Sequence, residues 1–194
     1  MNAKRALTDR ASAVPALAEA FREHGFEGAS LAILSQATGL GKGSLYNFFP
    51  GGKEEMMGAV LADIDDWFCA TIFAPLERPR DPEAAIRSMI GEVTAYFRSG
   101  GRVCLVGWVG LGSSGNAFVN RVRGYFAHWI SSLASCLEAG NVPPSQAQPL
   151  AEETVCGIQG AIILSRALGE EAAFARIVGR HEAMLLDALV RHSR

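Results

Sequence analysis

Five polar residues lie close together in the first third of the chain and could bind a negatively charged partner. Lys42 can pair with a phosphate or with the edge of a guanine base. The hydroxyl groups of Ser44 and Tyr46 suit phosphate oxygens, while Asn47 and Lys53 add an amide and a second cation. Proteins position and read nucleic acid with groups of this kind, so these residues predict a DNA-binding surface.

These side chains need a helix to present them, and the stretch SLAILSQATGLGKGSLYNFF (residues 30–49) predicts two short helices joined by a turn. Ser30 can cap the first helix, whose start also offers free backbone amides to a phosphate. Gly39 supplies the tolerance of positive φ that a helix end needs. A second helix follows from about Gly41 and ends at Pro50. Two helices across a short glycine turn are typical of a helix-turn-helix, whose second helix enters the major groove of DNA.

The second of these helices is expected to have an inward and an outward face. Leu45, Phe48 and Phe49 are predicted to face inward, and a glycine at position 43 lets one backbone approach another closely. The full set of predicted DNA-binding residues is Ser30, Gly41, Lys42, Gly43, Ser44, Tyr46, Asn47 and Lys53.

Residues 7–64 resemble the DNA-binding domain of the TetR/AcrR family of bacterial transcriptional regulators, and the KGSLYxxFP core is quite specific for that family. FPGGKEE and the Gly-x-x-Cys-Leu turn at Cys104 resemble its LmrA/YxaF branch. The sequence departs from the family at Pro15, usually an ordinary helix former, and at Phe48, often a histidine. The other residues that carry the resemblance are Ala20, Phe21, Gly25, Phe26, Ser30, Leu34, Ala37, Gly39, Leu40, Lys53, Glu54, Val60 and Leu61.

The whole sequence predicts an all-α protein of about nine helices. The first should run from about Thr8 to His24 with Gly25 as its cap, and either kink at Pro15 or start nearer Ser12. Further helices are expected at about residues 52–74, 82–99, 116–139, 145–168 and 170–191.

The stretch RVCLVGWVGLGSSGNA (residues 102–117) contains a short apolar run that would suit a buried strand, but the chain has no second strand candidate of similar strength, so we expect a short helix and a loop. The predicted domains are a helix-turn-helix domain over residues 1–50, a linking helix over 51–75, and a ligand-binding and dimerisation domain over 76–194. The resemblance implies that a shift of the linking helix re-aims the DNA reader.

Two further sets of residues are expected in the C-terminal part. An effector pocket would be lined by Phe97, Cys104, Trp108, Phe118, Tyr125, His128 and Trp129, although packing in a core explains each of them singly. The last two helices carry more small and apolar residues than one helical body needs to bury, and in the family such helices form a four-helix dimer interface. The predicted interface residues are Gly157, Ala161, Leu164, Phe174, Met184 and Leu185.

Other motifs point to no chemistry. GLGSSG at residues 110–115 matches a nucleotide-binding glycine pattern, but it lacks the surrounding strand–helix–strand unit and the acidic residue beyond it, so a loop is expected. The four histidines show no metal-ligand spacing, and no nucleophile-elbow motif is present. We therefore expect no enzyme, no cofactor and no metal.

Composition agrees with a folded regulator. The 194 residues are 49% hydrophobic and 20% charged with a formal net charge of −2, which argues against a generally basic DNA-coating protein. Four scattered cysteines without CxxC spacing suit reduced thiols, and the polar N-terminus does not resemble a signal peptide. The expected location is the cytoplasm.

Together these features predict a ligand-responsive repressor that binds a pseudo-palindromic operator as a homodimer and is released by a small hydrophobic effector. Two alternatives stay open. One is a regulator controlled by thiol oxidation, for which Cys104 is the candidate, or by a protein partner. The other is an all-α ligand-binding protein or enzyme with a relict DNA reader.

Overall fold

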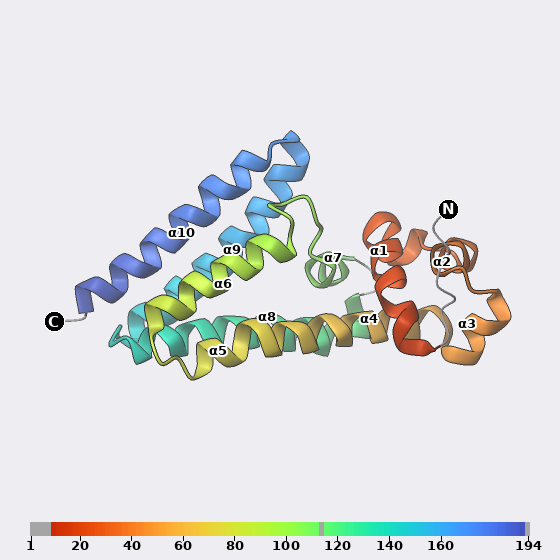
Figure 1. Ribbon diagram of the computed structural model, residues 1–194, viewed down its shortest axis with the longest axis horizontal. Helices are drawn as coiled ribbons and strands as arrows, with labels where there is room; N and C mark the ends of the chain where they lie inside the picture. The colour runs from red at the N-terminus through yellow and green to blue at the C-terminus, as the bar shows by residue number, and fades with distance from the viewer. Residues whose placement is uncertain (1–8, 113–114, 193–194) are drawn as a thin grey trace. The chain divides into compact units, whose positions relative to one another are not determined.

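The computed structural model describes residues 9–112 and 115–192, and within them every regular element is a helix (Figure 1). The chain divides into two compact units. Of the described residues, the first unit contains 9–65, 105–112 and 115–122, and the second contains 66–104 and 123–192.

The first unit is built from α1 (Arg10–Gly28), α2 (Leu31–Thr38), α3 (Lys42–Phe48), most of α4 (Gly52–Phe68), α7 (Leu105–Leu111) and the start of α8 (Gly115–Ala139). Its core is apolar, and burial of each such side chain contributes about 1.5–3 kcal/mol. The fully buried residues that α1 to α4 contribute to this unit are Ala13, Leu17, Phe21, Leu34, Leu45, Met56, Met57 and Val60.

Helix α1 begins one residue after Asp9, whose carboxylate accepts a hydrogen bond from the amide of Ser12 at 2.7 Å. The Ser12 hydroxyl lies 3.4 Å from the Asp9 amide, which completes a reciprocal capping box. The alternative start near Ser12 is therefore wrong, and the predicted start at Thr8 lies outside the described residues. Pro15 stays within the helix at an exposed position. Gly25 interrupts the helix with φ 68° and ψ 173°, close to the predicted end.

The second unit contains the end of α4, η1 (Cys69–Phe73), α5 (Ala74–Glu77), α6 (Pro82–Tyr96), most of α8, α9 (Pro144–Leu168) and α10 (Glu171–His192). Its core is centred on Phe68, whose ring centroid lies 4.9–6.2 Å from those of six other aromatic rings. These rings belong to Trp67, Phe73, Tyr96, Phe97, Tyr125 and Trp129.

The linking helix differs from its prediction at its end. We expected it to stop before Pro75, but the chain widens into the π-helical turn η1 and continues into α5. The amide of Ala74 bonds to the carbonyl of Cys69, five residues back. Pro75 has no amide hydrogen, and its ring crowds the carbonyl four residues earlier, so a wider turn before it keeps the run helical.

Most other boundaries agree with the sequence. The Asp81 side chain accepts a hydrogen bond from the Ala84 amide and caps α6, and Gly169 ends α9 in the left-handed conformation. The apolar run after residue 101 forms the short helix α7, as predicted, while Ser113 and Ser114 of the expected loop lie outside the described residues. With α4, η1 and α5 counted as one continuous run, the described part of the chain has nine helices. Across residues 9–112 and 115–192, none of the helices is both long and apolar enough for a membrane span.

The compact units do not follow the predicted domain boundaries. Residues 105–122 cluster with the N-terminal helices, although the prediction placed them in the C-terminal domain. Helices α4 and α8 each have residues in both units. We keep the functional division into a reader and a body as a proposal.

Candidate DNA-binding surface

The helix-turn-helix has the geometry that its sequence predicts. The Ser30 hydroxyl accepts a hydrogen bond from the Ile33 amide at 3.3 Å and caps α2. Gly39 closes α2 in the left-handed conformation with φ 70°. The Thr38 hydroxyl bonds to the carbonyl of Leu34 and accepts from the amide of Leu40. The turn is therefore held by side-chain hydrogen bonds of Thr38 at the end of α2.

Helix α3 has a buried side and an exposed side. Leu45 is fully buried, as is Phe49 just beyond the helix, whereas Phe48 is only half-buried. The opposite side is polar: Gly41, Lys42, Gly43, Tyr46 and Asn47 are exposed and Ser44 is half-buried. Ser30 at the start of α2 is also exposed. Seven of the eight predicted DNA-binding residues, all except Lys53, therefore lie at or on α2 and α3, and none of the seven is buried in the core.

Lys53 is held differently from Lys42. Its ammonium nitrogen donates to the backbone carbonyl of Glu27 at 3.3 Å and lies 4.6 Å from the ring centroid of Phe26. It is half-buried, so its charge is partly used to join the start of α4 to the end of α1. These contacts suit a role of Lys53 in holding α4 against α1, whereas the cation of Lys42 is exposed.

Two family profiles match the sequence. The family described as "Bacterial regulatory proteins, tetR family" matches residues 15–60. The one described as "Transcriptional regulator LmrA/YxaF-like, C-terminal domain" matches residues 82–180. The chain belongs to the TetR family. The predicted family, branch and all-α fold are confirmed, and the protein is a DNA-binding transcriptional regulator of a family whose members are not enzymes.

Individual relatives agree with this assignment. The chain is 30% identical to the HTH-type transcriptional regulator LmrA of Bacillus subtilis over 77 residues, which span 40% of this chain and only 41% of that protein. An uncharacterised HTH-type transcriptional regulator of Mycobacterium tuberculosis is 23% identical to this chain over 183 residues. The matched residues span 89% of this chain and 92% of that protein.

Solved structures share the fold at low sequence identity. A TetR transcriptional regulator from Legionella pneumophila superposes with a TM-score of 0.78 at 17% identity, over 95% of this chain and 99% of that one. A TetR-family regulator from Agrobacterium tumefaciens gives a TM-score of 0.77 at 22% identity, over 91% and 98%.

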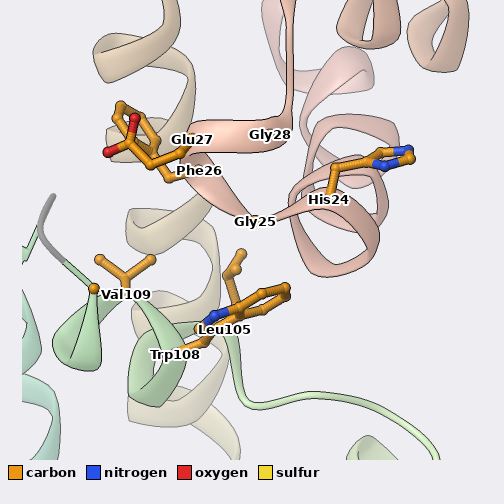
Figure 2. Close-up of a pocket in the computed structure, with 9 residues that line it drawn as sticks. His24, Gly25, Phe26, Glu27, Gly28, Leu105, Trp108 and Val109 are labelled. Atoms are coloured by element: carbon orange, nitrogen blue, oxygen red, sulfur yellow. The ribbon is translucent and has the colours of Figure 1, made fainter.

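A small cavity of about 200 Å³ lies beside the end of α1 within the first unit of this TetR-family chain (Figure 2). Figure 2 shows Gly25 near the indole of Trp108, and a Cβ atom on residue 25 would lie 3.2 Å from that ring. In the same unit, the ring of Phe118 packs edge-on against Phe26 at 5.6 Å between centroids.

The predicted effector-pocket residues fall in both units. Trp108 and Phe118 belong to the first unit, and their role in a pocket stays a prediction. Four others belong to the second unit and are buried: Phe97, Cys104, Tyr125 and Trp129. His128 is partly exposed there, with its ring 4.6 Å from that of Phe73.

The predicted dimer-interface residues also divide. Ala161, Phe174 and Leu185 are fully buried inside the protomer, so they cannot meet a partner. Their place on the buried sides of α9 and α10 explains their apolar character without a second chain. Gly157 and Met184 are half-buried, and Leu164 is 47% exposed.

Three exposed apolar residues on the last two helices were not among the predicted interface residues. Ile163, Leu168 and Val190 are 61%, 64% and 63% exposed on α9 and α10. Their exposure depends on which sides of α9 and α10 pack against each other, and no local sequence pattern states that. Among the residues that the structure describes, no group of three or more His, Cys, Asp or Glu side chains could hold a metal ion.

Proposed function

We propose that this TetR-family protein is a ligand-responsive repressor that binds a pseudo-palindromic operator as a homodimer. The observation that supports this best is the exposed polar side of α3 over a buried Leu45 and Phe49. The core fixes the helix, and its outer side chains are left to meet DNA.

The proposed contacts follow from the exposed groups. Lys42 supplies a cation for phosphate or guanine, and Tyr46, 46% exposed, offers its hydroxyl to a phosphate. A Cβ atom on Gly41 or Gly43 would meet nothing within 4 Å, so a sugar–phosphate backbone can come close. Ser44, Asn47 and the amides that follow Ser30 complete the surface, while Lys53 holds α4 against α1.

A small effector molecule in the second unit is supported by an orphan donor. The indole nitrogen of Trp129 is buried and has no hydrogen-bond partner in the described residues. Leaving such a donor unpaired costs about 1–3 kcal/mol, so a ligand with an acceptor atom would gain from meeting it. The surrounding aromatic rings favour a ligand that is otherwise hydrophobic.

Dimerisation through the outer sides of α9 and α10 is supported by their exposed apolar residues Ile163, Leu164, Leu168 and Val190. A two-fold dimer places two readers on two half-sites, which accounts for a pseudo-palindromic operator. The effector must bind the DNA-released arrangement more tightly than the DNA-bound one, because equal affinity would shift nothing.

The test is a gel-shift and salt-titration assay of the purified protein on DNA upstream of its own gene. We expect specific retardation that K42A/Y46A abolishes and that K42A alone weakens with a salt slope lower by about 1. R80A is the matched control, because Arg80 is an exposed cation in the second unit.

An absence of specific binding by the wild-type protein, in a random-sequence selection as well as on its own upstream DNA, would contradict the proposal and favour a relict reader. Retardation that R80A reduces as much as K42A would show non-specific charge attraction instead.

A further inference from the structure

Three chemically active side chains meet in the second unit where α4 gives way to η1 and α5. The His128 Nε2 atom lies 2.6 Å from a carboxylate oxygen of Glu77. The other ring nitrogen, Nδ1, lies 3.7 Å from the sulfur of Cys69. The chain therefore brings a carboxylate, an imidazole and a thiol into one row, from positions that are up to 59 residues apart.

The order of the three groups decides the position of the protons. A carboxylate only accepts hydrogen bonds, so the His128 Nε2 must carry the hydrogen that it donates to Glu77. In the neutral ring this leaves Nδ1 as an acceptor for the Cys69 thiol. The Ser132 hydroxyl oxygen lies 3.3 Å from the same Glu77 oxygen and 2.8 Å from the carbonyl oxygen of His128, so its single hydrogen is shared between these two acceptors.

This is the arrangement of an activated nucleophile. An imidazole within reach of a thiol can accept its proton, and the resulting thiolate–imidazolium pair is stabilised by the carboxylate on the far side of the ring. Cys69 also begins the π-helical turn η1, and π-helical turns occur frequently at functional sites.

The other cysteines have different surroundings. Cys136 is fully buried, and burial raises the pKa of its thiol to about 12. Cys104 is also buried, whereas Cys156 is exposed on α9. Cys69 is half-buried, so solvent reaches it less than it reaches Cys156. If exposure decides the reaction, a thiol reagent should modify Cys156 first, whereas activation by His128 predicts that it modifies Cys69 first.

We propose that Cys69 is a nucleophilic thiol that forms covalent adducts with soft carbon electrophiles such as α,β-unsaturated carbonyl compounds, with His128 as its base and Glu77 as the residue that positions His128. The reactivity stands independently of the proposed repressor function, but a regulatory effect of the adduct rests on it.

The reaction is an addition without oxidation. His128 takes the thiol proton, and the Cys69 sulfur forms a bond to the β-carbon as the carbon–carbon double bond gives up its π pair to an enolate. The proton returns from the imidazolium to the α-carbon. All atoms of the electrophile remain in the adduct, so no oxidant and no leaving group is needed.

The first experiment treats the full-length protein with a limiting amount of N-ethylmaleimide at pH 7 and maps the adducts by peptide mass spectrometry. A thiol with the ordinary pKa of about 8.5 is only a few per cent ionised at this pH. We expect Cys69 to react about 3-fold or more faster than Cys156, because a larger thiolate fraction outweighs the lower nucleophilicity of a more acidic thiol. Faster reaction of the more exposed Cys156 would overturn the proposal.

The second experiment measures the alkylation rate of each thiol against pH. The midpoint for Cys69 should lie about 1 pH unit or more below that for Cys156. H128Q should remove this difference, and E77Q should reduce it. H24Q is the matched control, because His24 is exposed and lies in the first unit. An unchanged midpoint in a folded H128Q would show that His128 does not act on the thiol, and thermal unfolding of each variant establishes that it is folded.

A gel shift with the alkylated protein tests the regulatory consequence separately. We expect the Cys69 adduct to lower operator affinity about 10-fold, and C69S to bind operator normally and to be insensitive to the reagent. If wild-type protein binds no operator, the repressor function fails while the alkylation order still decides the thiol proposal. Operator binding that is equal with and without the adduct would overturn the regulatory part alone.

Discussion

Gly25 has a backbone conformation that only glycine adopts easily, with φ 68° and ψ 173°. A side chain there would also meet the Trp108 ring. We expect G25A to lower the free energy of unfolding by about 1–3 kcal/mol, as strained backbone at such a position does. Urea unfolding measures the change.

Gly58 in α4 is the matched control, because a Cβ atom at that position meets nothing within 4 Å. There G58A should raise the free energy of unfolding by up to about 1 kcal/mol through helix propensity. Equal effects of the two substitutions would show that neither the conformation nor the Trp108 contact constrains position 25.

Single residues were predictable where their role is local. Ser30 and Gly39 cap α2 through atoms a few positions away, so the sequence is enough to assign them. Lys53 was not predictable in the same way, because its partners Phe26 and Glu27 lie on another helix. Nor was Trp108, since its neighbour Gly25 is distant in the chain.

Helices α9 and α10 pack together through a notch at Gly157. A Cβ atom there would overlap the His181 ring, so this contact within the protomer needs a residue as small as glycine, while a role of Gly157 in the dimer interface stays a prediction. We expect G157A to lower the free energy of unfolding by about 1–3 kcal/mol, as overpacking does.

The control for this substitution lies one turn away on the same helix. A Cβ atom on Gly160 meets nothing within 4 Å, so G160A should leave the free energy of unfolding unchanged or raise it by up to about 1 kcal/mol. Thermal and urea unfolding of both variants decide the comparison, and a stable G157A would mean that the His181 ring turns away without cost.

The His181 ring also makes this helix pair sensitive to acid. Desolvation lowers the pKa of His181 below its ordinary value, opposed by the charge of Glu153 and reinforced by that of Arg180. The unfolded chain therefore binds the proton more readily, and stability is full above about pH 6.5 and falls as the pH drops below it.

The measurement is the urea midpoint at pH 7.5 and at pH 5.5. The wild-type midpoint should fall more over this interval than that of H181Q, while H24Q should behave as the wild type because His24 is exposed. A pH dependence that H181Q leaves intact would assign the effect to other groups.

At the scale of elements, the sequence predicted which segments are helices and most of their ends, because capping residues such as Asp81 and Gly169 act locally. It did not predict η1. A proline usually ends a helix, and only the packing of Phe68 and Phe73 in one aromatic core shows why the run continues to Pro75 and beyond.

For the whole molecule, the sequence identified the family but not the membership of residues 105–122 in the first unit. The segment is apolar in either unit, and its partner Phe26 is distant in the chain. The proposed dimer face has the same difficulty, because a buried Leu185 and an exposed Leu164 look alike in the sequence until the packing of α9 on α10 is known.

That packing makes the proposed dimer testable at Leu164, which is 47% exposed on α9. In a dimer through this face, L164E would bury an unpaired carboxylate, and we expect the dimer to dissociate about 100-fold more readily, equivalent to about 2.7 kcal/mol.

V119E is the matched control, since Val119 is 45% exposed on α8 in the first unit. Sedimentation velocity over a concentration series should give monomer for L164E and dimer for V119E. Operator binding should weaken with L164E, because two half-sites need two linked readers. A dimer that L164E leaves intact would place the interface on another surface.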